Sequence, residues 1–174
     1  MVSWYAEKMM ELPIYEESYK MFRELLHCSD AKILDIGCGL GVISAYLQQQ
    51  CPIYQLSGID FSAEMISLAQ SHLPQGHFQV TDCRQMNFET ASFDGVVCGD
   101  CIPYLDSVEL ENFFKDIAVM LKEGGILYVS FLEGDEEASG FTKGSTGDWA
   151  YFFYHDLNWI NQLTKSIGLN KSGH

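Results

Sequence analysis

Short apolar runs alternate with amphipathic stretches along most of this chain. The apolar runs end at turn residues and predict buried strands at 32–36, 56–60, 77–81, 93–98 and 126–131. The stretches between them carry apolar residues at three-to-four spacing, which predicts helices. Strands that alternate with helices are typical of a parallel sheet with helical crossovers, so the pattern predicts an α/β fold.

Individual residues indicate where several helices begin and end. The spacing of apolar positions before the first strand predicts an amphipathic helix that carries Tyr15, Tyr19, Phe22 and Leu26. A second helix is predicted at 42–50. Ser62 and Asp106 each precede a helical stretch and are predicted to be N-caps, because their side-chain oxygens can accept from free backbone N–H groups. Gly124 and Gly125 are predicted to end the helix that follows Asp106.

The regular pattern stops after the fifth predicted strand. Residues 133–148 are rich in Gly, Ser, Thr and acids, and they predict a loop that orders only with ligand. A last helix is predicted at 158–166. Gly168 then opens what should be another strand, where the sequence stops.

The composition is that of a globular protein with one sizeable core. The chain has 174 residues, of which 47% are hydrophobic and 20% charged. Its net charge is −14 and its basic residues are scattered, which argues against nucleic acid or a membrane surface as partner. No apolar run approaches the roughly 20 residues of a membrane span. The N-terminal residues lack the apolar stretch of a secretory signal, so we expect a cytoplasmic location.

The first predicted strand leads into a glycine-rich turn with carboxylates nearby. Asp35 lies at the end of that strand, and three glycines follow before the next helix: Gly37, Gly39 and Gly41. Glycines let the backbone approach a ligand closely, and a helix N-terminus presents free N–H groups. Asp60 and Asp82 follow the second and third strands at the same carboxyl edge, where open α/β sheets bind ligands. A carboxylate at 60 can accept both hydroxyls of a ribose, and Asp82 can accept an adenine amine or orient the backbone that does.

Four segments with consistent spacing carry a family resemblance: Ile33–Gly41, Gly58–Ser62 followed by Met65, Phe93–Cys98, and Leu121–Leu127. They resemble the motifs of class I S-adenosylmethionine-dependent methyltransferases, over roughly residues 30–131. The resemblance implies a Rossmann-like, mostly parallel sheet sandwiched by helices. It also implies S-adenosylmethionine as cofactor and S-adenosylhomocysteine as product.

The resemblance assigns a part of the cofactor to each candidate residue. The backbone of the glycine turn, including Cys38, would line the methionine part, and Asp35 would help to hold its amino group. Asp60 would bind the ribose, with Phe61 and Met65 packed on the adenine. The other cofactor-binding residues that it implies are Gly41, Asp82, Cys83 and Cys98.

Each of these residues alone also has an ordinary structural explanation. Glycines after a strand serve strand-to-helix packing, Asp60 and Asp82 can cap turns, and Met65 can be a core residue. One shared ligand is favoured because the carboxylates fall at one edge of the sheet, in chain order.

The resemblance implies that residues 1–29 form N-terminal lid helices and that 30–174 form the cofactor-binding domain. The aromatics Trp4, Tyr5, Tyr15 and Tyr19 either close over the cofactor or pack in the core. The family's sheet ends with an antiparallel strand pair, which is incomplete here. Either the chain is truncated, or residues 148–154 supply a substitute edge strand, or a partner subunit does, and a homodimer is one remedy for an unpaired edge.

Two other kinds of site compete with this interpretation. A dinucleotide-binding oxidoreductase would need G-x-G-x-x-G, but Val42 occupies the place of the third glycine, and Asp35 would repel pyrophosphate. The C-x-x-C sequence from Cys98 to Cys101 resembles a redox site, but incidental thiols are the favoured explanation. No set of four ligands indicates a structural metal site.

The predicted reaction is methyl transfer to a small uncharged or cationic acceptor. The chain must align the acceptor with the S–CH3 bond, which can contribute about 7–11 kcal/mol. If a base is needed, Asp100 and His155 are the candidates, although a lone histidine is more often structural. A methyltransferase fold that binds a partner without catalysis is the remaining alternative.

Overall fold

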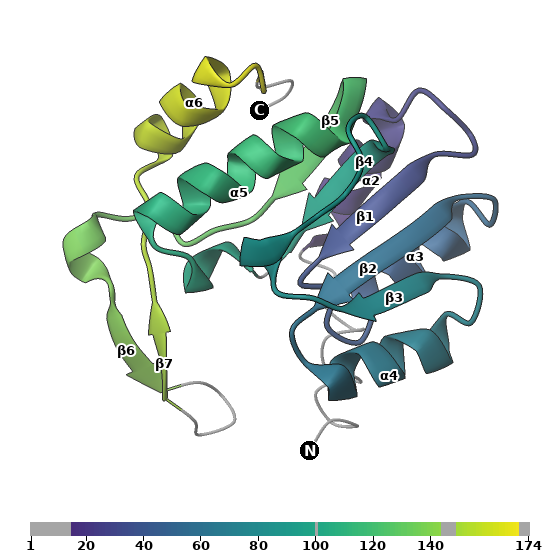
Figure 1. The fold of residues 1–174 in the computed structure, drawn as a ribbon, viewed down its shortest axis with the longest axis horizontal. Coiled ribbons are helices and arrows are strands. Elements are labelled where there is room, and N and C mark those ends of the chain that lie inside the picture. The colour runs from purple at the N-terminus through teal and green to yellow at the C-terminus, as the bar shows by residue number, and fades with distance from the viewer. Residues whose placement is uncertain (1–14, 100, 144–148, 171–174) are drawn as a thin grey trace.

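The computed structural model describes residues 15–99, 101–143 and 149–170. Its main sheet is parallel throughout, in the order β3-β2-β1-β4-β5 (Figure 1). The strands are β1 (Lys32–Ile36), β2 (Gln55–Asp60), β3 (His77–Val80), β4 (Phe93–Cys98) and β5 (Leu121–Val129). The Rossmann-like α/β fold is therefore confirmed, and the strand order reverses between β1 and β4.

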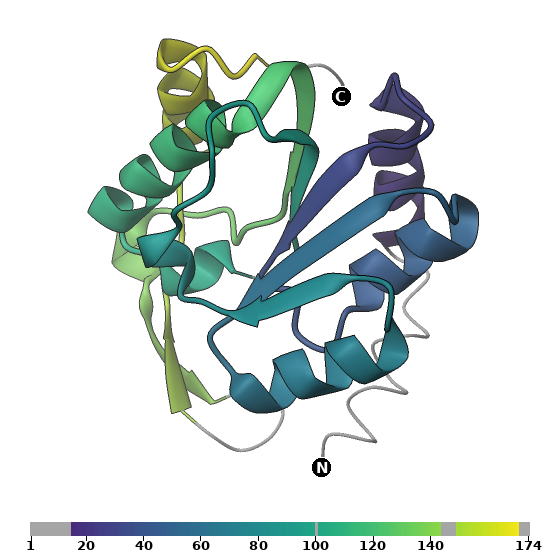
Figure 2. The ribbon, with the colours of Figure 1, turned by 45° about the vertical axis from the view of Figure 1, so that its right-hand side comes forward.

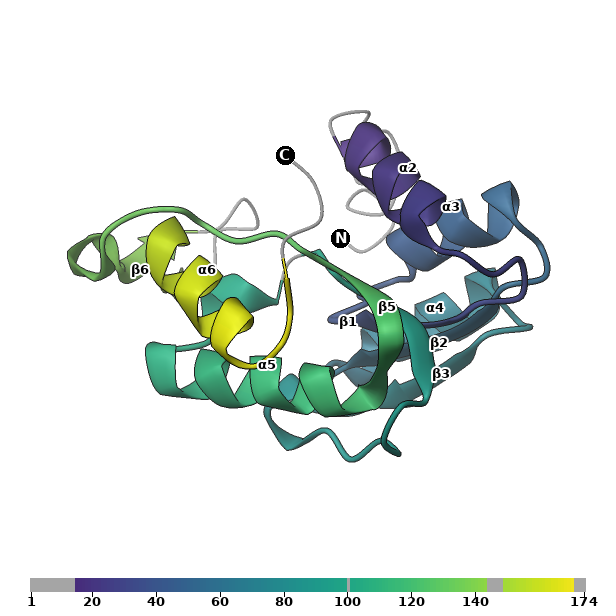
Figure 3. The ribbon, with the colours of Figure 1, turned by 90° about the horizontal axis from the view of Figure 1, so that it is seen from above.

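Helices cover both faces of this sheet (Figures 2 and 3). They are α2 (Glu16–Leu25), α3 (Val42–Gln50), α4 (Ala63–His72), α5 (Ser107–Met120) and α6 (Leu157–Ser166). Helices α2 and α3 lie on one side of the sheet, and α5 and α6 lie on the other. Because both faces are covered, nearly every residue of β1 is buried.

Alternate residues of β1 divide the core into two clusters. Ile33 packs with Phe22 and Leu47 on the side of α2 and α3. Leu34 belongs to the cluster that includes Phe113 and other apolar residues of α5. Successive strand residues point to opposite faces, so a continuous apolar run is what a doubly covered strand requires.

Both predicted helix caps are confirmed. The Ser62 side chain accepts from the N–H of Met65 at the start of α4. Asp106 caps α5 by accepting from the N–H groups of Val108 and Glu109, and the Glu109 carboxylate accepts from the Asp106 N–H in return. This reciprocal capping box fixes the start of the longest described helix.

The predicted end of α5 at Gly124–Gly125 is wrong. The helix ends at Met120, and β5 begins at Leu121, which is buried and pairs with Phe93. The glycines instead lie within β5, where the pairing with β4 shifts register and Gly124 takes a φ of 74°. A glycine accommodates such an irregularity without the Cβ clash of other residues.

The predicted loop at 133–148 is also partly wrong. It contains a short 3₁₀ helix, η4 (Glu136–Ala138), and β6 (Gly140–Lys143), which pairs antiparallel with β7 (Trp149–Phe152). These two strands form a separate two-stranded sheet, so residues 148–154 do not supply an edge strand to the main sheet. No strand follows α6 in the part of the chain that the structure describes.

Candidate functional site

A cavity of about 1180 Å³ opens at the carboxyl edge of the main sheet. Its walls include residues that directly follow β1, β2, β3 and β4, so it lies at the point where the strand order reverses. This is the position at which open α/β sheets bind their ligands. The volume exceeds the range of roughly 300–1,000 Å³ that is usual for one small-molecule site, so the cavity has room for more than one small molecule.

The glycine turn forms one wall of this cavity. Gly37 and Gly39 have φ angles of 67° and 52°, in the left-handed region that side chains disfavour. A Cβ atom on Gly37 would lie 3.0 Å from the Cβ of Cys101, so the turn packs tightly there. A Cβ atom on Gly39 would meet no atom within 4 Å. Gly39 therefore presents bare backbone to the open space of the cavity.

The carboxylate of Asp60 holds the glycine turn in place. One of its oxygens accepts from the Gly39 N–H at 2.9 Å, and the other accepts from the Ser62 N–H at 2.8 Å. These bonds fix the carboxylate in the cavity wall, at the end of β2. Each carboxylate oxygen has two acceptor positions, so capacity remains for hydroxyl groups of a ligand.

Asp35 lies behind the turn rather than in the cavity wall. Its side chain is buried, and it accepts a hydrogen bond of 2.7 Å from the Ser44 hydroxyl in α3. This bond joins the end of β1 to the first turn of the helix that follows the glycines. In the described geometry Asp35 supports the glycine turn from behind.

Three apolar residues predicted to contact the cofactor lie in the cavity wall: Cys38, Phe61 and Met65. Phe61 is 80% exposed, although it is a large apolar residue. Exposed aromatic side chains beside a cavity are a usual feature of ligand sites. The Cys38 thiol is buried, and burial together with the nearby carboxylate of Asp35 raises its pKa.

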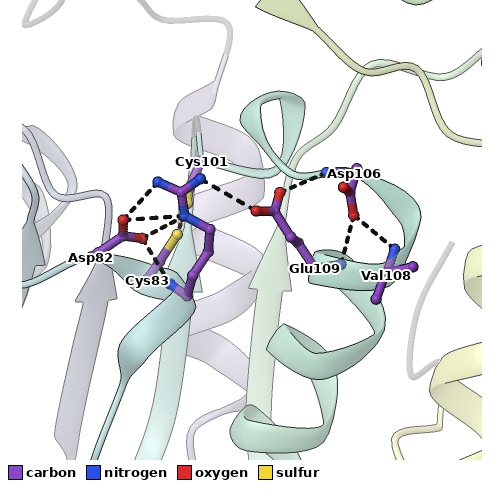
Figure 4. Close-up of polar contacts among 7 residues, drawn as sticks. Asp82, Cys83, Cys101, Asp106, Val108 and Glu109 are labelled. Carbon is purple, nitrogen blue, oxygen red and sulfur yellow. Dashed lines mark hydrogen bonds and ion pairs between the residues drawn. The ribbon is translucent and has the colours of Figure 1, made fainter.

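Asp82 lies in the cavity wall and is paired with Arg84. The guanidinium of Arg84 donates to both oxygens of Asp82, with distances down to 2.6 Å, and it also donates to Glu109 at 3.3 Å. The hydrogen bonds from Arg84 hold the pKa of Asp82 below its ordinary value. Figure 4 shows this network extending to the capping box at Asp106. Arg84 was not among the residues predicted for the site.

Two thiols meet in the same wall. The sulfur atoms of Cys83 and Cys101 lie 3.0 Å apart, although the residues follow different strands (Figure 4). Their mutual hydrogen bond and burial raise the pKa of Cys83.

Three other predicted residues, Gly41, Cys98 and His155, are described by the structure and are not part of the cavity wall. Cys98 is fully buried in the core, and Gly41 packs against Ala69 of α4 and Leu73 directly after it. His155 is 3% exposed, and its Nε2 lies 3.0 Å from the Leu105 carbonyl oxygen. Burial lowers the pKa of His155. Asp100, Trp4 and Tyr5 lie outside the described residues.

An acidic and aromatic wall closes the cavity on the side of α2 and α3. We give the name aromatic wall to its four residues, which are Tyr15, Glu16, Tyr19 and Tyr46. The ring centroids of Tyr19 and Tyr46 lie 5.8 Å apart, and those of Tyr15 and Tyr19 lie 6.2 Å apart. The sequence analysis named Tyr15 and Tyr19 as lid or core residues but missed Glu16 and Tyr46. The four residues of the aromatic wall come together only because α2 lies beside α3 in the fold.

Among the described residues, no helix is long and apolar enough to cross a membrane. In the same part of the chain, no group of three or more His, Cys, Asp or Glu side chains is arranged to hold a metal ion.

Comparison with known families identifies the class of protein. A family model for a methyltransferase domain matches residues 33–125, more than half of the chain. These residues contain the glycine turn, Asp60 and the strands that surround the cavity. The chain belongs to this methyltransferase family.

Individual relatives and a solved structure agree with this assignment. The chain is 27% identical over 164 residues to the protein named methyltransferase 235L of Invertebrate iridescent virus 6, covering 91% of this chain and 61% of the relative. It is 29% identical to phosphoethanolamine N-methyltransferase 2 of Caenorhabditis elegans, covering 88% of this chain and 36% of that protein. It is 26% identical to a ubiquinone biosynthesis O-methyltransferase of Coxiella burnetii, covering 79% and 62%.

The fold is also that of a solved S-adenosylmethionine-dependent methyltransferase from Methanosarcina mazei. The TM-score is 0.73 at 23% identity, and the match covers 83% of this chain and 82% of that one. The chain thus spans less than two thirds of the length of each of the three relatives described above, whereas it matches most of this smaller structure.

Proposed function

We propose that this chain transfers a methyl group from S-adenosylmethionine to a small-molecule acceptor. The observation that carries the proposal is the cavity wall in which bare backbone at Gly39 is held by the Asp60 carboxylate. This wall offers a close approach for a ligand and a fixed acceptor pair for ribose hydroxyls. Membership of the methyltransferase family supports the same conclusion.

The described residues fit this cofactor without a metal or a protein nucleophile. Gly37 and Gly39 would border its methionine part, Asp60 its ribose, and Phe61 and Met65 its adenine. The bound cofactor supplies a methyl group on a positively charged sulfur, which is already reactive toward nucleophiles. The contribution of this chain is to bind, to orient the acceptor and to exclude water.

Binding of S-adenosylhomocysteine, measured by calorimetry beside NAD, tests the proposal. We expect the nucleoside product to bind and NAD not to bind, because the Gly39 N–H that would contact pyrophosphate donates to Asp60 and a carboxylate there repels phosphate. The Asp60→Asn variant should bind about tenfold more weakly, since an amide replaces one acceptor oxygen by a donor.

The control for this test is Glu111→Gln, which alters an exposed pair with Lys115 on α5. Its affinity for S-adenosylhomocysteine should match that of the unaltered chain. Preferential binding of NAD would replace the proposal by a hydride-transferring enzyme. Binding of S-adenosylhomocysteine without turnover of any acceptor would indicate a binding protein with this fold.

We further propose that the acceptor is an amine. Among the residues that the structure describes, the acidic ones in the cavity wall are Glu16, Asp60 and Asp82, and the basic one, Arg84, is paired with Asp82 and Glu109. An anionic acceptor would therefore meet repulsion. The rings of the aromatic wall provide faces that attract the positive charge formed on a nitrogen when it accepts a methyl group, worth about 0.5–2 kcal/mol.

Glu16 has a specific place in this proposal. Glu16 lines the cavity beside the tyrosines of the aromatic wall, so a carboxylate at this position attracts an ammonium group toward the cavity. The named reaction of the nematode relative is methylation at nitrogen, and that of the Coxiella relative is methylation at oxygen. Both chemistries occur among the relatives, and the acidic lining of this cavity supports methylation at nitrogen.

A panel of amines, phenols and carboxylic acids, assayed by release of S-adenosylhomocysteine, tests the acceptor class. We expect amines to be methylated, and the Glu16→Gln variant to lose about tenfold in kcat/KM for them, equivalent to about 1.4 kcal/mol. Glu24→Gln, on the same helix but paired with Lys20 on the exposed side, is the matched control. Turnover of acids in preference to amines would contradict this assignment.

A homodimer and a cytoplasmic location stay predictions from the sequence. The oligomeric state is measurable by light scattering of the purified chain.

A further inference from the structure

Two thiols in the cavity wall are not reacting groups in methyl transfer, although Cys83 is an expected cofactor contact. The sulfur atoms of Cys83 and Cys101 lie 3.0 Å apart and face each other across two loops (Figure 4). Cys83 begins a short 3₁₀ helix, η2 (Cys83–Gln85), after β3, and Cys101 immediately precedes another, η3 (Ile102–Tyr104), after β4. The structure therefore brings Cys101 against a cysteine 18 residues away in sequence, and both thiols are free.

The loops on both sides of this pair are held by further contacts. Next to Cys83, Arg84 is bound by Asp82 and by Glu109 of α5. Cys101 packs closely on the glycine turn: a Cβ atom added to Gly37 would lie 3.0 Å from the Cβ of Cys101. The facing arrangement of the two sulfurs thus follows from the packing of two separate elements.

A disulfide between these residues needs only a small movement. The sulfur–sulfur bond is about 2.05 Å long, so the two atoms must approach by about 1 Å. Both residues also line the cavity, which provides a path for a small oxidant. Cys28 and Cys51 lie outside the cavity wall.

Both thiols are held mostly in the protonated, less reactive form. The hydrogen bond to Cys101 and burial raise the pKa of Cys83. The pKa of Cys101 is lowered by its hydrogen bond with Cys83, but the hydrogen bond with Cys98 and burial outweigh this and raise it overall. Because the thiolate is the reactive form, oxidation is expected to be slow at neutral pH and faster at alkaline pH.

We propose that Cys83 and Cys101 are a site of reversible oxidation by peroxide, and that their disulfide weakens binding of the nucleoside cofactor. The first thiolate attacks a peroxide oxygen, the O–O bond breaks, and a sulfenic acid and one water result. The second thiol then attacks the sulfenic sulfur and displaces a second water. The sum is two thiols and one hydrogen peroxide, giving one disulfide and two waters.

The effect on binding rests on the proposed function of the same cavity. Cys83 follows Asp82 at the expected adenine edge, and Cys101 packs on Gly37 of the glycine turn. Movement of Cys101 toward Cys83 alters the packing of that turn and joins the two loops across the cavity wall. A bound ligand and the disulfide then oppose each other, so each disfavours the other by the same factor.

Treatment of the purified chain with hydrogen peroxide, followed by mass spectrometry, tests the first part. We expect the intact mass to fall by about 2 Da and the digested protein to contain a peptide pair linked through Cys83 and Cys101. The link should disappear with dithiothreitol and form more slowly when S-adenosylhomocysteine is present. Calorimetry of the oxidised chain should show affinity for S-adenosylhomocysteine lower by about tenfold or more, restored on reduction.

Cysteine variants separate this pair from its neighbours. The Cys83→Ser and Cys101→Ser variants should each have the same affinity before and after peroxide, whereas Cys51→Ser should respond as the unaltered chain does. A link from Cys98 to Cys101, or an unchanged affinity after the Cys83–Cys101 link has formed, would overturn the proposal. Failure of the reduced chain to bind S-adenosylhomocysteine, with the link still formed, would instead count against the proposed function and leave the oxidation site standing.

Discussion

At the scale of single residues, Gly37 and Gly39 of the glycine turn are required for different physical reasons. Both need a left-handed φ, but Gly37 packs against Cys101, whereas Gly39 faces open space. A side chain at 37 would collide with protein, and a side chain at 39 would project into the cavity. A side chain at 37 should therefore reduce the stability of the fold more, and a side chain at 39 should reduce ligand binding more.

The variants Gly37→Ala and Gly39→Ala test this separation by urea unfolding and calorimetry. Gly39→Ala should lose about 1–2 kcal/mol of stability, the cost of a side chain in the left-handed region, and should bind S-adenosylhomocysteine at least about tenfold more weakly. Gly37→Ala should lose more stability, because Cys101 must also move. Equal effects of both variants on stability would contradict the described packing.

At the scale of elements, hydrogen bonds of His155 join the segment between β5 and α6 to the rest of the fold. The N–H of His155 donates to the Leu132 carbonyl, and the Gly134 N–H donates to the His155 carbonyl. The buried imidazole contacts the Leu105 carbonyl in the loop before α5. His155 therefore joins three segments, and its role in this structure is to hold them together.

This role predicts a pH dependence of stability. Burial lowers the pKa of His155 below its ordinary value of 6.5, so the unfolded chain binds the proton more readily than the folded chain. As pH falls below about 6.5, the free energy of unfolding should decrease by up to about 1.4 kcal/mol per pH unit, until the folded-state pKa is reached.

Urea unfolding between pH 7.5 and 5.5 measures this slope. His155→Gln should be less stable at neutral pH and should lose most of the slope, whereas His77→Gln, at an exposed position of β3, should keep it. A slope that persists in His155→Gln would assign the effect to another group.

At the scale of the whole molecule, the main sheet could be predicted from the sequence, whereas the β6–β7 pair that follows it could not. Each central strand is a buried apolar run that can be recognised locally, as Ile33 and Leu34 illustrate, which are both fully buried but on opposite faces of the sheet. The carboxylates that follow the strands were therefore placed at one edge by topology alone. The β6–β7 pair has mostly exposed residues, so no apolar pattern indicates it.

Long-range pairing accounts for the parts of the site that the sequence analysis missed. The meeting of Cys83 with Cys101, and of Tyr19 with Tyr46, depends on the side-by-side placement of separate loops and helices. The positions of Asp60 and Gly39, by contrast, follow directly from strand ends. Asp35 was correctly placed at the end of a strand, but its burial behind the turn depends on Ser44 in α3.

The small β6–β7 sheet is separate from the main sheet, and it contacts the cavity wall at Tyr104. Its Phe152 ring contacts Tyr104, which lines the cavity, and the Phe153 N–H donates to the Pro103 carbonyl. Changes of length or sequence in this hairpin can thus reshape one end of the cavity while the nucleoside end keeps its geometry. On the proposed function, the acceptor end of the cavity can vary in this way independently of the end that binds the methyl donor.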